Sequence, residues 1–145
     1  MRKVLAALAV AAAMTAPVST VQAADMMAAP PPMIADSVCF DTDVLGDVES
    51  QFEYGAPRML RADLSIVEFS NLQERGFLPR NEERLVERHY CQGTVLISDG
   101  QYRTVYYVVE DPMGFASMGR RAEGCVLGLD AWHVYGAGCQ SLRRF

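Results

Sequence analysis

The pattern of apolar and polar positions predicts β-strands in two regions of the chain. In residues 60–66, apolar side chains alternate with Arg61, Asp63 and Ser65, which is the two-residue period of a half-buried strand. In residues 88–110, two apolar-rich segments flank the dipeptide Asp99-Gly100, which is typical of a tight hairpin turn. We therefore expect one strand before the middle of the chain and a β-hairpin after it.

The expected hairpin has strands at 88–98 and 101–110, with Ser98 opposite Gln101. This register places His89 opposite Glu110. Both faces of the hairpin then carry bulky side chains, which predicts a central position in the sheet and cover on both sides. Pro112 ends the second strand because proline cannot donate to the ladder.

The remaining segments predict shorter elements. Residues 69–80 read as a connection or one helical turn, and Asn81 as the start of a short helix. Apolar residues at helical spacing predict another short helix over 122–129. Residues 132–135 read as a strand and residues 139–145 as a candidate closing strand. Together these elements predict the α+β class: a small single domain with an antiparallel sheet around the central hairpin.

The N-terminus has the features of an export signal. Arg2 and Lys3 precede a short apolar run, and the small residues Val21 and Ala23 fit the positions before a signal-peptidase cleavage site. Residues 1–23 are therefore expected to be cleaved. The absence of an Arg-Arg pair favours the general secretory route, and with it a periplasmic location.

Two further segments complete the expected organisation. Residues 24–35 are rich in Ala and Pro and predict a flexible linker, followed by the domain at 36–145. The apolar run of the signal is too short to span a bilayer, and no longer run follows it. No membrane span is therefore expected after cleavage.

The charge balance limits the classes of partner. The chain has 13 basic and 18 acidic residues, for a net charge of −5, and half of its residues are hydrophobic. Proteins that bind nucleic acid or anionic membranes need a cationic face, so neither class of partner is expected. Residues 24–57 contain acidic residues but no Lys or Arg, since the first basic residue after them is Arg58. This stretch is therefore acidic.

The four cysteines form an even set in a chain predicted to be exported, which predicts two disulfides. Three pairings are open from the sequence. We prefer Cys125–Cys139, a short local loop, together with Cys39–Cys91, which would tie the N-terminal segment to the hairpin. No CxxC is present and the Cys/His spacings fit no zinc pattern, so no metal or cofactor is expected.

Residues 41–49 partly resemble a calcium-binding loop. Asp41 and Asp43 occupy the first and third positions, and Gly46 the sixth. However, Leu45 stands at the fifth position, and Phe52 stands where a bidentate glutamate is required. We favour a solvated acidic stretch over a calcium site.

The expected pair of His89 and Glu110 offers one candidate for catalysis. A carboxylate beside an imidazole can act in general acid–base chemistry, as in small exported ribonucleases, although no ribonuclease motif is present. The favoured alternative is a structural ion pair across the hairpin. His133, between Trp132 and Val134, is expected to be a half-exposed strand residue.

Aromatic residues offer a candidate binding surface. The side chains that could contribute to it are Tyr102, Tyr106, Trp132 and Tyr135. Such residues also commonly form the core or the cover of a sheet, which is the favoured reading.

Residues 84–144 carry several motifs, among them His89-Tyr90-Cys91-Gln92-Gly93, Met113-Gly114-Phe115 and His133-Val134-Tyr135. In these motifs the C-terminal half resembles a group of small exported proteins of alphaproteobacteria that carry no assigned function. The resemblance implies a bacterial envelope setting and transfers no catalytic role.

The sequence thus leads to two expectations of function. The first is a non-enzymatic binding or structural module of the cell envelope, whose partner is an envelope protein or a small envelope component. The alternative is a small acid–base hydrolase that uses His89 and Glu110.

Overall fold

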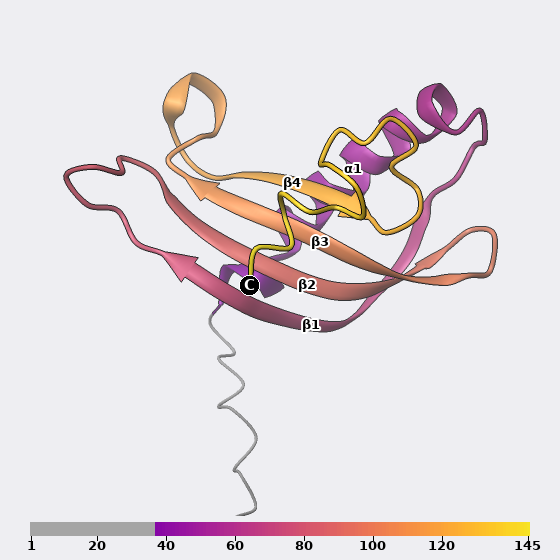
Figure 1. The fold of residues 1–145 in the computed structure, drawn as a ribbon, viewed down its shortest axis with the longest axis horizontal. Coiled ribbons are helices and arrows are strands. Elements are labelled where there is room, and N and C mark those ends of the chain that lie inside the picture. Colours follow the sequence, from indigo (N-terminus) through magenta and orange to yellow (C-terminus); the bar gives the residue numbers. More distant parts are fainter. Residues whose placement is uncertain (1–36) are drawn as a thin grey trace, which may run out of the picture. The chain divides into compact units, whose positions relative to one another are not determined.

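The computed structural model describes residues 37–145, apart from the side chain of Ser117, as one helix packed on one four-stranded antiparallel sheet (Figure 1). The strands follow the chain order β1-β2-β3-β4 across the sheet. Their bounds, with those of α1 and two short 3-10 helices, are η1 (Val38–Phe40), α1 (Thr42–Met59), β1 (Ile66–Leu78), β2 (Glu87–Ile97), β3 (Tyr102–Asp111), η2 (Phe115–Ser117) and β4 (Arg121–Val126). The predicted α+β class, with β2 and β3 as the central hairpin, is confirmed.

The predicted signal peptide at 1–23 and linker at 24–35 lie outside the described residues. Within 37–145, no helix is long and apolar enough to cross a membrane.

Helix α1 begins at Asp41, whose carboxylate accepts a hydrogen bond from the backbone N–H of Asp43 at 2.9 Å. This is N-capping, which satisfies one of the free donors of the first turn. The buried face of the helix carries Val44, Val48 and Ala56, spaced by four and eight residues. Residues 41–49, expected as a solvated acidic stretch before the core, form the cap and first turns of this helix and contribute Val44 and Val48 to the core.

One face of the sheet packs against α1 and η1. The shared core contains Val95, Val105, Tyr107 and Val109 of the central strands, all essentially inaccessible to solvent. The disulfide Cys39–Cys91 joins η1 to β2 within this core. This half of the predicted pairing is therefore confirmed.

The other face of the sheet is covered by the irregular segment 127–145. Tyr90 and Val108 of the sheet pack there with Leu142, beside the disulfide Cys125–Cys139 that joins β4 to this segment. The predicted strands at 132–135 and 139–145 were wrong, because both stretches form turns. The side chain of Asp130 accepts hydrogen bonds from two backbone N–H groups of the first stretch, which holds it as a turn.

Strand β1 differs from the prediction for this region. Of the predicted strand at 60–66 only Ile66 is in a strand, and the predicted connection at 69–80 is most of β1. Three register shifts interrupt the pairing of β1 with β2. Asn71, which lies within the shift between Ser70 and Gln73, has a φ of 50°. These irregularities remove the alternation by which a strand is found in a sequence.

Two predicted helices are absent from the described residues. The side chain of Asn81 accepts from the backbone N–H groups of Glu83 and Arg84, as in a helix cap, but the chain closes a turn and continues into β2. Residues 122–129 form β4 and a following turn instead of a helix. The alternation of apolar and polar residues expected of a strand is not visible in β4, because Gly124, which faces α1, has no side chain.

The hairpin of β2 and β3 is confirmed, but its expected register was wrong by one residue. Leu96 lies opposite Tyr102, and the loop has three residues, 98–100, in place of two. The N–H of Gly100 donates to the carbonyl of Ile97, and Gly100 then adopts a φ of 81°. A turn followed by a left-handed glycine is a common three-residue hairpin loop. The shift moves every opposed pair, so His89 faces Val109 and Glu110 faces Arg88.

Candidate functional site

An open polar cleft of about 520 Å³ lies at one end of the sheet. Its walls come from η1, the start of β2, the end of β3 and the residue that precedes β4. The charged and titratable side chains that line it are Asp41, Glu87, His89, Asp111 and Arg120. The same disulfide that fixes η1 to β2 therefore also fixes two walls of the cleft relative to each other.

The imidazole of His89 is held in one orientation. Its Nδ1 lies 2.9 Å from Oε1 of Glu74, and the hydroxyl of Ser37 donates to Oε2 of the same carboxylate at 2.5 Å. The ring of Phe77 stacks on the imidazole with 4.3 Å between centroids. A carboxylate accepts hydrogen bonds, so Nδ1 carries the proton and Nε2 faces Glu87, whose Oε1 is 3.7 Å away.

Two of the carboxylates are directly opposed. Glu87 and Asp111 are the last cross-strand pair of β2 and β3. Within residues 37–145 neither forms an ion pair with an arginine. Like charges in directly opposed positions reduce the stability of a sheet, so this pair is costly unless a cation lies between its members.

The third carboxylate of the cleft is paired. Asp41 lies 2.7 Å from Nη1 of Arg120. The backbone N–H of Asp43, and then Arg120, hold the pKa of the Asp41 carboxyl below its usual value. Both groups thus remain charged near neutral pH and their charges cancel. The cleft keeps the two negative charges of Glu87 and Asp111.

The expected pair of His89 and Glu110 does not form. The two side chains lie on opposite faces of the hairpin, because neighbouring residues of a strand point to opposite sides. Glu110 instead accepts from Nε of Arg88 at 2.6 Å, which raises the pKa of that arginine further. The acidic neighbours of His89 are Glu74 and Glu87.

The four candidate aromatic residues do not make one exposed surface. Tyr102 and Trp132 are about two-thirds exposed, whereas Tyr106 and Tyr135 are partly buried against the second core cluster. The hydroxyl of Tyr135 accepts from Nε2 of Gln51 at 2.6 Å, and Tyr135 lines a mainly apolar cavity of about 200 Å³ between α1 and β4. Burial raises the pKa of its phenol.

Sequence reasoning missed five residues of the cleft and its hydrogen-bond network, namely Ser37, Glu74, Glu87, Asp111 and Arg120. Glu74 lay in a segment expected to be a connection, and Glu87 preceded the expected strand. The only available signal was the acidic character of residues near His89, which does not identify a partner without the register.

In the part of the chain that the structure describes, no group of three or more His, Cys, Asp or Glu side chains is placed to hold a metal ion. Comparison with the models of known protein families, with curated proteins and with solved structures found no match to the chain. The resemblance of residues 84–144 to small exported proteins therefore stays a prediction, and the cleft is the basis for a proposal of function.

Proposed function

We propose that this chain is an exported binding module of the bacterial cell envelope, and that its cleft binds a cationic group of an envelope protein or a small envelope component. The observation that carries the proposal is the opposition of Glu87 and Asp111 at the open end of the hairpin. A guanidinium or ammonium group between them would remove their repulsion and donate hydrogen bonds to the carboxylates on both sides.

The electrostatics of the surroundings favour such a ligand. The arginine in the cleft is already paired with Asp41, so it does not compensate the opposed carboxylates. Behind them, among residues 37–145, the carboxylate of Glu74 accepts hydrogen bonds from a hydroxyl and an imidazole. A cation in the cleft therefore gains attraction from several acceptors, whereas an anion is repelled.

The size of the cleft and the covalent framework support the same role. A volume of about 520 Å³ accommodates an amino-acid side chain with part of its backbone. The two disulfides support an oxidising compartment, in agreement with the N-terminal signal expected from the sequence. A periplasmic location remains part of this proposal.

The test is a titration of the disulfide-bonded protein with N-acetyl-arginine amide at low salt, followed by NMR. We expect shifts at β2 and β3 that saturate, with binding at least tenfold weaker in the Glu87→Gln/Asp111→Asn variant. Glu82→Gln removes the same kind of charge from the exposed β1–β2 loop and should leave binding unchanged. Equal binding of the uncharged citrulline analogue, or binding of neither compound, would refute the proposal.

A second candidate function is acid–base catalysis by His89. The specific observation is the hydrogen bond that Nδ1 of His89 donates to Glu74, which orients the ring and leaves Nε2 toward the cleft and Glu87. Neutral esters are the substrates to screen, with His89→Ala as the test and Trp132→Ala as the control. Equal rates in wild type and His89→Ala would rule out this function.

A further inference from the structure

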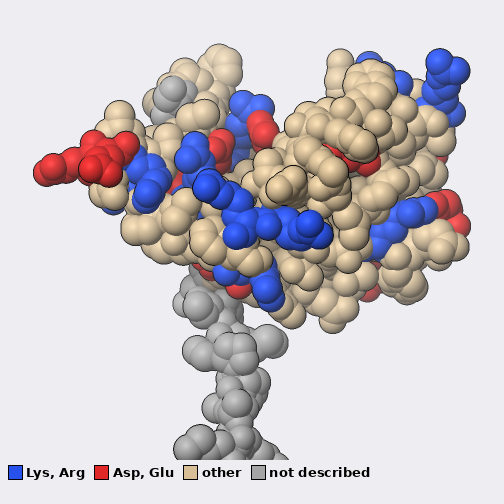
Figure 2. Space-filling model, viewed as in Figure 1, with Lys and Arg blue, Asp and Glu red and all other residues tan. Residues whose placement is uncertain are grey.

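The loop between β3 and β4, residues 112–120, exposes an apolar surface. The side chain of Phe115 is 95% exposed, that of Met118 70% exposed and that of Met113 36% exposed. In Figure 2 this loop rises at the upper left, where its described atoms are mostly uncharged, with basic and acidic side chains at its foot. Exposed apolar side chains gathered on one loop are typical of a contact site.

The loop is held in shape by its own backbone. The N–H groups of Met113 and Gly114 both donate to the carbonyl of Gly119, and that of Met118 donates to Phe115. Gly114 is required, since a Cβ atom there would lie 2.1 Å from the carbonyl oxygen of Met118. Ala116 takes a φ of 55°, a left-handed conformation that is unfavourable for alanine. The apolar tip is therefore presented before any partner binds, which lowers the entropy cost of binding.

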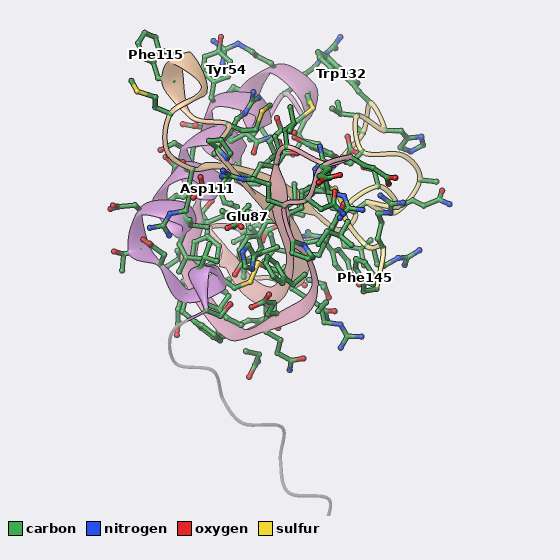
Figure 3. All side chains as sticks on the ribbon, turned by 90° about the vertical axis from the view of Figure 1, so that its left-hand side faces the viewer. Tyr54, Glu87, Asp111, Phe115, Trp132 and Phe145 are labelled. Atoms are coloured by element: carbon green, nitrogen blue, oxygen red, sulfur yellow. A yellow bond between two sulfur atoms is a disulfide. The ribbon has the colours of Figure 1, made fainter. Side chains whose placement is uncertain are left out.

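The loop begins and ends at the cleft. Asp111 directly precedes it and Arg120 is its last residue, and both residues line the cleft. Figure 3 views this end of the molecule, with Phe115 above Asp111 and Glu87. Four peptide links separate the Cα atoms of Asp111 and Phe115, which allows a distance between them of at most about 14 Å. A ligand chain of about five extended residues is thus long enough to touch both.

The charges at the foot of the loop argue against a lipid surface. Arg120 is paired with Asp41, and Arg121 with Glu123 at 2.5 Å. The arginines beside the apolar tip therefore provide no cationic excess, and the opposed carboxylates of Glu87 and Asp111 would repel anionic headgroups. The same charges complement a basic protein segment.

We infer that the loop and the cleft form one docking surface, and that its partner is an extended protein segment with a basic residue within about five positions of an apolar side chain. The basic residue occupies the cleft between Glu87 and Asp111, and the apolar side chain packs on Phe115 and Met118. This inference rests on the proposed function and adds the class of partner to it.

The experiment pans a display library of random dodecapeptides on the disulfide-bonded protein at low salt. We expect enriched peptides to contain Arg or Lys with an aliphatic or aromatic residue nearby. The enriched peptide should bind at least tenfold more weakly to Phe115→Ser and to Glu87→Gln/Asp111→Asn. Trp132→Ser, which removes another exposed aromatic side chain, serves as the matched control and should bind as wild type does.

The outcomes separate the two claims. Enriched basic peptides that bind Phe115→Ser as tightly as wild type would overturn the docking surface and leave the cation-binding cleft intact. No enrichment, or enrichment without basic residues, would overturn both. Binding to phosphatidylglycerol vesicles that depends on Phe115 would replace the protein partner with a membrane. Melting temperatures no lower than that of wild type check that each variant is folded, and Met118→Ser provides a second variant of the loop.

Discussion

The hydroxyl of Tyr107 donates a hydrogen bond to the backbone carbonyl of Cys39 across 2.6 Å. Tyr107 also lies directly opposite Cys91 in the sheet, and Cys91 is the disulfide partner of Cys39. The three residues connect η1 to the sheet by a covalent bond and a buried hydrogen bond. We expect Tyr107→Phe to lower the free energy of unfolding by about 1–3 kcal/mol, because the buried carbonyl loses its donor. Urea unfolding measures this loss, with the exposed Tyr102→Phe as a control; an equal effect of both substitutions would contradict it.

The same tyrosine makes the free energy of unfolding depend on pH in the alkaline range. Burial raises the pKa of the Tyr107 phenol above its ordinary value of 10. The unfolded chain therefore ionises first, and its stabilisation lowers the free energy of unfolding as the pH rises above about 10. One such group contributes a slope of at most about 1.4 kcal/mol per pH unit. Unfolding curves between pH 9 and 11 should show a smaller slope in Tyr107→Phe, and an unchanged slope would argue against this assignment.

The two disulfides should differ in their effect on stability. Cys39 and Cys91 are 52 residues apart in sequence, and Cys125 and Cys139 are 14 apart. Restriction of the unfolded chain predicts about 4 kcal/mol for the longer loop and about 3 kcal/mol for the shorter one. The Cys39→Ser/Cys91→Ser variant is therefore expected to unfold at lower denaturant concentration than Cys125→Ser/Cys139→Ser. The reverse order would indicate that native packing, more than loop length, sets the difference.

Gly124 allows α1 to approach β4. A Cβ atom at this position would lie 2.6 Å from Cγ1 of Val48, whose side chain is almost fully buried. We expect Gly124→Ala to cost about 1–3 kcal/mol through overpacking. In a Val48→Ala background, where the methyl groups are absent, the same substitution should cost less. A double-mutant cycle measures this coupling, and strict additivity would show that the two positions are not in conflict.

Alanine substitutions at two further glycines are expected to change the free energy of unfolding in opposite directions. Gly100 has a φ of 81°, so Gly100→Ala should lower the free energy of unfolding by about 1 kcal/mol or more. Gly46 lies inside α1 and a Cβ atom there would meet nothing within 4 Å. Gly46→Ala should therefore raise stability by about 0.5–1 kcal/mol. Thermal unfolding of the two variants gives both signs in one experiment, and a stabilising Gly100→Ala would show that the loop has a different conformation.

The features that the sequence predicted correctly are those set by local or covalent constraints. Asp99-Gly100 predicted the hairpin because the dipeptide favours a tight turn wherever it stands. The preferred cysteine pairing was correct because one pair was local and the other then followed. The register was wrong because Asp-Gly occurs in both two- and three-residue loops, and the choice depends on the conformation of Gly100.

The errors in the other strands have separate physical causes. The register shifts of β1 place polar and apolar residues without a regular period, while Gly124 removes one side chain from the pattern of β4. The segment after β4 carries a strand-like run at 132–135, but Asp130 captures its backbone N–H groups. Hydrogen bonds of this kind, between a side chain and the backbone, leave little trace in hydrophobic periodicity.

The candidate site could be predicted only in part. His89 was identified from its residue type, but its partners depend on register and on a strand that was not expected. Glu74 reaches His89 from β1, whereas Glu110 is turned to the other face by the one-residue shift. Phe115 was noted only within a motif, since nothing in the sequence distinguishes an exposed phenylalanine from a core one.

The interruptions of β1 have a consequence for the molecule in concentrated solution. β1 is an edge strand of 13 residues, long enough to template the addition of a strand from another copy. Its pairing with β2 shifts between Ile66 and Glu68, between Ser70 and Gln73, and between Glu74 and Gly76. A neighbouring chain would have to reproduce these offsets to form a continuous ladder along the edge. The irregular strand that brings Glu74 to His89 thus also disfavours the addition of strands from other copies of the protein, and with it aggregation.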